Sequence, residues 1–142
     1  MQTVVFMRTT LFTVMLLLAA SCTRTPDAYV FRSDDRPVYA RTATVDDIEA
    51  VGPDNATIID VRLSEDFASS PAMIPGAIRR DPEAISDWAS ELPKDRPVVV
   101  YCVKGKWVSQ KAATYLDQHG FDVRSLEGGI DAWDARTSEL SK

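Results

Sequence analysis

The 142-residue sequence predicts an α/β domain with a central, mostly parallel sheet that is covered by helices on both faces. Segments rich in β-branched and apolar residues, at 57–61, 98–101 and 121–126, alternate along the chain with segments whose apolar residues have helical spacing. The first two are almost continuously apolar, which is typical of parallel strands buried on both sides. With 45% hydrophobic and 26% charged residues, the composition is that of a globular domain.

The first half of the predicted domain contains two helices. One follows Thr44, whose hydroxyl can cap its N-terminus, and it ends at Gly52 and Pro53. The other follows Asp81, a good N-cap, and has Pro82 at its first position. The apolar side chains on one face of this second helix are Ile85, Trp88, Ala89 and Leu92.

The second half contains two more predicted helices. The first covers 109–119 and is closed by Gly120 at its C-terminal end. Its inward-facing residues are Ala112, Ala113 and Leu116. After the strand at 121–126, Gly128 and Gly129 open a turn into a last, short helix. The apolar residues of that helix are Ile130 and Trp133.

The N-terminal residues do not belong to the predicted domain. Residues 11–20 (LFTVMLLLAA) form an apolar run that is too short for a helix across a bilayer and suits the core of a signal peptide. Arg8 supplies the positive charge before this run, and we expect Met7 to be the translation start. Small residues then lead into Cys22, an ending that resembles a bacterial lipobox. We therefore predict a lipoprotein-type signal peptide at 1–21 and acylation of Cys22.

The residue after this cysteine bears on localisation. Thr23, rather than Asp, follows Cys22, and by resemblance to sorted lipoproteins this predicts a lipid anchor in the outer membrane, on the periplasmic side. The alternatives are a soluble periplasmic protein released by signal cleavage and a short membrane anchor. The polar, proline-containing segment 22–43 is then a tether, 44–137 the domain and 138–142 a C-terminal tail.

Charge and cysteine usage exclude several classes of protein. The net charge of −5 gives no reason to expect a nucleic-acid partner, which needs a basic face. His119 is the only histidine in the sequence, so no Cys/His cluster predicts a metal site. If Cys22 is acylated, Cys102 is the one remaining thiol and no internal disulfide is possible. The Cys102 thiol is then either buried and inert or used in a chemical reaction.

Cys102 stands where the predicted strand at 98–101 ends and a loop leads into the next helix. Ligands of parallel α/β sheets bind at the carboxyl ends of the strands. A helix N-terminus also presents unpaired N–H groups and the positive end of a dipole, which favour the nucleophilic thiolate. Ser109 is the expected N-cap, and its hydroxyl can also reach the sulfur. The residues that line this predicted site are Val103, Lys104, Gly105, Lys106, Trp107, Val108 and Ser109.

Four segments, in this order and spacing, together resemble a single rhodanese-like (sulfurtransferase) domain. They are Ile59-Asp60-Val61-Arg62, Ile74-Pro75-Gly76-Ala77, the strand and loop that hold Cys102, and the run LEGGIDAW at 126–133. The resemblance covers most of the chain that follows the tether, from about Thr44 to Trp133. It implies the rhodanese-like α/β fold.

The resemblance also implies a persulfide mechanism without a metal or organic cofactor. Cys102 would attack the outer sulfur of a small anionic donor such as thiosulfate, and a thiol or cyanide acceptor would then remove the bound sulfur. Lys104 and Lys106 would attract the anionic donor. Asp60 and Arg62 are expected to have a structural role near the site, where they fix the loop after the first strand.

The sequence departs from the family at two positions. Many members carry an Arg immediately before the Ser or Thr that opens the helix, and this position holds Val108. Dual-specificity phosphatases and arsenate reductases of the same superfamily use that Arg to hold an oxyanion, through a bidentate contact that valine does not make. Phosphatase or arsenate-reductase chemistry is therefore the less favoured alternative, and a non-catalytic binding or persulfide-sensing module is the other. Met73 replaces a histidine that is common before the Ile-Pro-Gly-Ala segment.

Overall fold

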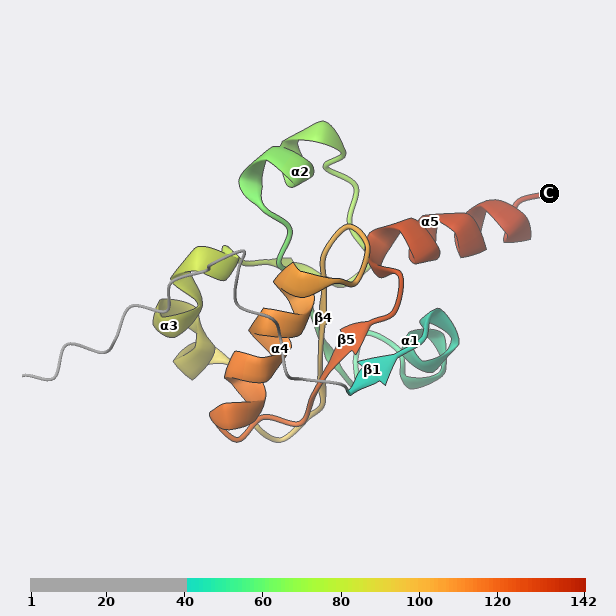
Figure 1. Ribbon diagram of the computed structural model, residues 1–142. Coiled ribbons are helices and arrows are strands. Elements are labelled where there is room, and N and C mark those ends of the chain that lie inside the picture. Colours follow the sequence, from blue (N-terminus) through green and yellow to red (C-terminus); the bar gives the residue numbers. More distant parts are fainter. Residues whose placement is uncertain (1–40) are drawn as a thin grey trace, which may run out of the picture.

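The computed structural model describes residues 41–142, and Figure 1 shows their arrangement. The predicted signal peptide, Cys22 and all but the last residues of the predicted tether lie outside these described residues. Five strands form one sheet in the order β1-β5-β4-β2-β3, and every pairing in it is parallel. The strands are β1 (Thr42–Ala43), β2 (Thr57–Asp60), β3 (Ile78–Arg79), β4 (Val98–Tyr101) and β5 (Val123–Leu126).

Helices cover both faces of the sheet, as predicted (Figure 1). The α-helices are α1 (Val45–Val51), α2 (Ser64–Ser69), α3 (Ile85–Trp88), α4 (Trp107–Gln118) and α5 (Gly129–Leu140). Apolar residues of α3 and α4 pack on one face, and those of α1 and α5 pack on the other. Neighbouring residues of β4 divide between the faces, because Val100 faces α4 whereas Tyr101 packs with Ile130 of α5. A fully buried aliphatic side chain such as that of Val100 stabilises the fold by about 1.5–3 kcal/mol.

Local capping follows the sequence closely at α1. The Thr44 hydroxyl accepts a hydrogen bond from the Asp47 N–H, and the Asp47 carboxylate accepts one from the Thr44 N–H. The helix ends at Gly52, whose φ is +76°. At the end of α4, Gly120 has a φ of +83° and its N–H donates to the Asp117 carbonyl. Both predicted helix ends are confirmed.

The segment after Asp81 differs from the single helix that we predicted. It consists of a 3-10 turn (Pro82–Ala84), the short α3 and a second 3-10 turn (Ala89–Glu91). The Asp81 carbonyl accepts from the Ala84 N–H and from the Trp88 indole N–H, at 3.2 and 2.7 Å. In a continuous α-helix this carbonyl would instead accept from the N–H four residues later. The predicted buried face is nevertheless confirmed, with Ile85, Trp88, Ala89 and Leu92 in the core.

Three elements were not predicted: the two-residue strands β1 and β3 and the short helix α2. Strand β1 pairs with β5, although its residues fall at the end of the predicted tether. Strand β5 begins at Val123 rather than 121, because the Phe121 N–H is bonded to the Leu116 carbonyl of α4. Helix α5 is 12 residues long and continues beyond residue 137. No helix within residues 41–142 combines the length and apolarity that a bilayer crossing needs.

Candidate active site

Cys102 lies immediately after β4, at the carboxyl end of the parallel sheet, as the sequence predicted. Its side chain is 5% exposed and packs with the core on the α4 face. It is a free cysteine, and no other cysteine is present among residues 41–142. The sulfur therefore sits at the edge where ligands of such sheets bind.

Helix α4 begins at Trp107, two residues before the start that we predicted, so Ser109 is not its N-cap. Lys106 occupies the cap position and makes no side-chain capping bond. The extra half turn is held by Gln110, whose N–H donates to the Lys106 carbonyl at 3.0 Å and whose side-chain amide donates to the Gly105 carbonyl at 3.1 Å. Ser109 is thereby turned into the core, where its Oγ lies 3.3 Å from the Cys102 Sγ.

The loop after Cys102 turns its carbonyl groups toward α5. The Cys102 carbonyl accepts from the Ile130 N–H at 2.9 Å, and the Val103 carbonyl accepts from the Asp131 N–H at 3.1 Å. In a trans peptide the C=O of one residue and the N–H of the next point in opposite directions. The N–H groups of Val103 and Lys104 therefore point away from α5, toward the side of the sheet where the Cys102 side chain packs. These two bonds fix the orientation of the first two peptide groups of the loop.

Two glycines permit this contact between the loop and α5. Gly105 has a φ of +63°, and a Cβ added to it would lie 2.2 Å from the Leu126 carbonyl oxygen. Gly129 has a φ of +59°, and a Cβ there would lie 2.3 Å from the Cys102 carbonyl oxygen. Both distances are far below van der Waals contact, so a side chain at either position displaces the loop.

A pocket of about 230 Å³ opens above Cys102. It is lined by Asp66, Cys102, Val103, Lys104, Lys106, Trp107 and Val108. The structure thus brings most of the predicted site residues to one cavity, while Gly105 and Ser109 are buried and do not line it. Asp66, from the first turn of α2, was not predicted. Nothing in its local sequence indicates a site, because α2 reaches the pocket only through the tertiary fold.

The charges at this pocket largely offset one another. The Lys104 ammonium lies 3.4 Å from the carboxylate of Asp131 on α5, and this negative charge offsets part of the positive charge of Lys104. Lys106 is exposed, and the acidic Asp66 faces the same cavity. Trp107 is 37% exposed, and the Lys111 ammonium lies 5.9 Å from the centroid of its ring. The pocket is therefore less cationic than the two lysines alone suggest.

Asp60 and Arg62 form a buried ion pair next to the site, with 0% and 1% of their surfaces exposed. The Arg62 Nη2 lies 2.6 Å from the Asp60 carboxylate, and its guanidinium also donates to the carbonyls of Ser70 and Ala72. These bonds fasten both ends of the segment that contains α2.

Tyr101 is buried near the same ion pair. Burial, together with the Asp60 charge, raises the pKa of Tyr101 well above its usual value, and the Tyr101 hydroxyl accepts a hydrogen bond from the Ile74 N–H.

Ser125 of β5 was not predicted and lies behind the site. It is 1% exposed, and its hydroxyl donates to the Ser109 Oγ at 2.9 Å. Its register with Val100 of β4 places it on the α4 face of the sheet. Only this register, set by the pairing of β4 with β5, connects it to Cys102. A polar residue in the middle of a strand segment is the one signal that the sequence offers.

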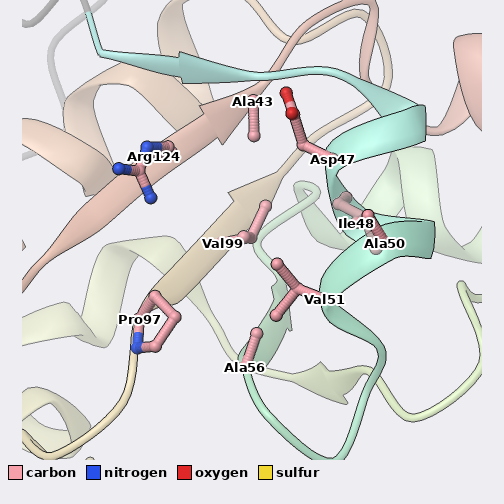
Figure 2. Close-up of a pocket in the computed structure, with 9 residues that line it drawn as sticks. All are labelled: Ala43, Asp47, Ile48, Ala50, Val51, Ala56, Pro97, Val99 and Arg124. Atoms are coloured by element: carbon pink, nitrogen blue, oxygen red, sulfur yellow. The ribbon is translucent and has the colours of Figure 1, made fainter.

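A larger pocket, of about 360 Å³, lies away from Cys102, between α1 and the strands β4 and β5 (Figure 2). Its walls are mainly apolar, with Asp47 and Arg124 as the charged residues. Hydrogen bonds from the Thr44 N–H and hydroxyl lower the pKa of Asp47. This cavity contains no cysteine or other nucleophilic side chain. No group of three or more metal-ligating side chains occurs within residues 41–142, and His119 is exposed on α4's C-terminal end.

Comparison with known proteins identifies the family. The rhodanese-like domain family matches residues 44–136, and the chain therefore belongs to it. A thiosulfate sulfurtransferase GlpE from Pseudomonas savastanoi pv. phaseolicola is 38% identical over 88 residues, which are 61% of this chain and 80% of that protein. A sulfurtransferase from Allochromatium vinosum is 40% identical over 81 residues, 56% of this chain and 73% of that protein.

The fold is also that of solved structures. The crystal structure of a rhodanese-related protein from Thermoplasma volcanium superposes with a TM-score of 0.60 at 24% sequence identity, over 68% of this chain and 93% of that one. The α/β rhodanese-like fold expected from the sequence is thus confirmed.

Proposed function

We propose that this protein is a sulfurtransferase that carries sulfane sulfur on Cys102. The observation that carries the proposal is the position of this thiol, at the carboxyl end of β4, inside a loop whose carbonyls are tied to α5. The N–H groups of Val103 and Lys104 point to the side of the sheet where the Cys102 side chain packs, and backbone N–H groups there can stabilise a thiolate and an anionic persulfide. The thiosulfate sulfurtransferase and sulfurtransferase relatives support the same reaction class.

In the first step, the Cys102 thiolate attacks the outer sulfur of the donor. With thiosulfate, an S–S bond forms at Cys102, the S–S bond of the donor breaks, and sulfite leaves with the electron pair. The enzyme now holds Cys102–S–S⁻, and the total charge of −3 is the same on both sides of the equation. Loop amides and the N-terminal end of α4 stabilise the terminal sulfur anion.

In the second step, an acceptor nucleophile attacks the terminal sulfur of the persulfide. Cyanide would leave as thiocyanate, and a thiolate acceptor would leave as a persulfide. In both cases the bond between the Cys102 Sγ and the carried sulfur breaks, and its electron pair stays on the Sγ, which becomes a thiolate again. No cofactor takes part, because the oxidation state of the transferred sulfur is set by the donor.

Val108 supports sulfur transfer over oxyanion hydrolysis. Its side chain is 5% exposed and belongs to the apolar core beside Cys102. A phosphatase or arsenate reductase of this superfamily would need a guanidinium at that position to hold the equatorial oxygens of the oxyanion. The pocket offers ammonium groups on Lys104 and Lys106 instead, which act as point charges.

The test is intact-mass spectrometry after incubation with thiosulfate, using a Cys22→Ala variant so that Cys102 is the only thiol. The reactive thiolate should gain about 32 Da, one sulfur atom, and cyanide should remove it. The matched Cys102→Ser protein should gain nothing. If the thiol protein gains no mass from thiosulfate or from another sulfane donor, yet binds a partner saturably, the non-catalytic binding module is favoured. Cys102-dependent hydrolysis of an aryl phosphate would favour the oxyanion alternative.

We also propose that the domain is held on the periplasmic side of the outer membrane by acylation of Cys22. The support is the apolar run at 11–20 followed by small residues and the cysteine. Cells that express the protein should incorporate labelled fatty acid into it, and Cys22→Ala should abolish the label. Labelling that survives Cys22→Ala, or its absence from the unchanged protein, would contradict acylation and favour a soluble periplasmic form.

A further inference from the structure

Behind Cys102, three side chains from three elements form a buried hydrogen-bonded row. The Cys102 Sγ lies 3.3 Å from the Ser109 Oγ of α4, and the Ser125 hydroxyl of β5 donates to that same Oγ at 2.9 Å. Their exposed fractions are 5%, 0% and 1%. The row runs from the sulfur into an otherwise apolar core, where every buried polar hydrogen needs a partner.

The number of hydrogens restricts how this row can be arranged. Ser109 has a single hydroxyl hydrogen and two nearby acceptors, the Cys102 Sγ and the Lys106 carbonyl oxygen, each at 3.3 Å. While Cys102 is a thiol, its S–H can donate to Ser109, and Ser109 donates to the Lys106 carbonyl. Once the sulfur is a thiolate it has no hydrogen to give, and the Ser109 hydroxyl turns its hydrogen to the sulfur.

Ser125 supports both arrangements, because it donates to Ser109 in each of them. Its bond occupies one lone pair of the Ser109 oxygen and holds that oxygen beside the sulfur. A hydroxyl that accepts a hydrogen bond is also a stronger donor, since the bonds of a chain polarise one another. The gain is larger when the acceptor is an anion.

The geometry points to Ser125 as a positioning residue for the reaction: acting through Ser109, it stabilises the Cys102 thiolate. The inference rests on the proposed function in taking the thiolate as the nucleophile, but the hydrogen-bonded row exists whatever the sulfur donor is. Ser125 does not line the pocket above Cys102, so it makes no contact with substrate there.

The test measures how the rate of alkylation of Cys102 by iodoacetamide depends on pH, in the Cys22→Ala background. Ser125→Ala should move the midpoint of this profile upward by about half a pH unit, since half a unit corresponds to a weakened, not a lost, hydrogen bond to the anion. Ser109→Ala should move it further. Ser125→Ala added to Ser109→Ala should move it no more, because the connection to the sulfur is already broken.

Two controls separate positioning from packing. Ser125→Thr keeps the hydroxyl and should have the same alkylation midpoint as the unchanged protein. Val98→Ala removes apolar volume from the same face of the sheet and should lower the denaturation midpoint while leaving the alkylation profile in place. An unchanged profile in Ser125→Ala, or equal shifts of Ser125→Ala with and without Ser109, would overturn the inference. Because alkylation needs no sulfur donor, failure of persulfide formation would count against the proposed function alone.

Discussion

Gly105 shows how strictly a single residue constrains the loop around Cys102. Its φ of +63° and the 2.2 Å distance from an added Cβ to the Leu126 carbonyl oxygen leave no room for a side chain. Gly105→Ala is therefore expected to separate the loop from α5 and to cost about 2–4 kcal/mol of folding free energy, from backbone strain and overpacking together. Persulfide formation should fall at least about tenfold, because the amides lose their orientation.

Gly120→Ala is the matched control for that prediction. Gly120 also has a positive φ, +83°, but its added Cβ would meet only the Lys94 ammonium, at 3.8 Å. It should lose about 1 kcal/mol of stability from backbone strain and keep the rate of sulfur transfer. Urea denaturation and persulfide formation by mass spectrometry measure the two effects. Equal loss of activity in both variants would show that the close approach at Gly105 is unimportant.

Tyr101 gives a prediction about alkaline pH. Burial and the Asp60 charge raise its pKa in the folded protein above the usual value of about 10. The native state therefore keeps the phenol proton after the unfolded chain has begun to lose it. This contribution to stability is complete below about pH 10 and is lost as the pH rises above that value, at up to about 1.4 kcal/mol per pH unit.

Tyr101→Phe should remove this alkaline dependence. At pH 8 the variant is expected to be about 1–2 kcal/mol less stable, because the Ile74 N–H loses its acceptor. Between pH 10 and 11 the difference from the unchanged protein should shrink. Urea denaturation at each pH measures it, and a difference that stays constant across this range would contradict a shifted tyrosine.

At the scale of elements, the placement of α2 depends on one buried arginine. Arg62 pairs with Asp60 and also bonds the carbonyls of Ser70 and Ala72, which follow α2. Arg62→Leu leaves the Asp60 carboxylate buried without its partner and should cost about 3–5 kcal/mol. The pocket should be altered as well, since α2 supplies Asp66.

The comparison pair is Arg136 and Asp46, an exposed ion pair at 3.0 Å. Arg136→Leu should change stability by no more than about 1 kcal/mol, because water screens an exposed pair. Asp60→Asn combined with Arg62→Leu should recover part of the loss, since no uncompensated charge remains buried. Denaturation midpoints decide the matter, and similar losses for Arg62→Leu and Arg136→Leu would contradict the assigned role of the buried pair.

At the scale of the whole molecule, a net charge of −5 and an acidic residue in the pocket both oppose a doubly charged donor. Asp66→Asn removes one negative charge at the pocket and should lower the KM for thiosulfate by about two- to fivefold at low salt. A singly charged donor such as methanethiosulfonate should gain only the square root of that factor, because the Coulomb energy scales with donor charge. Added salt should suppress both effects.

Glu139→Gln, an equal change of charge on the last turn of α5, provides the control for Asp66. At the same low salt it should change both KM values less than Asp66→Asn does, because Glu139 lies eight residues beyond Asp131 on α5, about 12 Å along the helix, and the Coulomb energy falls with distance. Equal changes of KM for the singly and doubly charged donors in Asp66→Asn would show that this residue acts through shape rather than charge.

How far the sequence predicts the molecule depends on how local the cause is. Three predictions that follow from neighbouring residues are confirmed: the continuously apolar strand β4, the Thr44 cap and the helix end at Gly120. Strands β1 and β3 were missed because two residues become a strand only beside a partner that is distant in sequence. Asp66 and Ser125 were missed for the same reason, since each reaches Cys102 only through tertiary packing.

The bonds from the Ile130 and Asp131 N–H groups to the carbonyls after Cys102 have a consequence for biosynthesis. Cys102 is made well before these residues, which lie near the C-terminal end of the sequence. A nascent chain that still has α5 inside the ribosome has its thiol but not the hydrogen bonds that hold the loop around it. The loop therefore reaches its final arrangement only after the C-terminal helix has formed, so the order of synthesis makes this part of the fold one of the last to be completed.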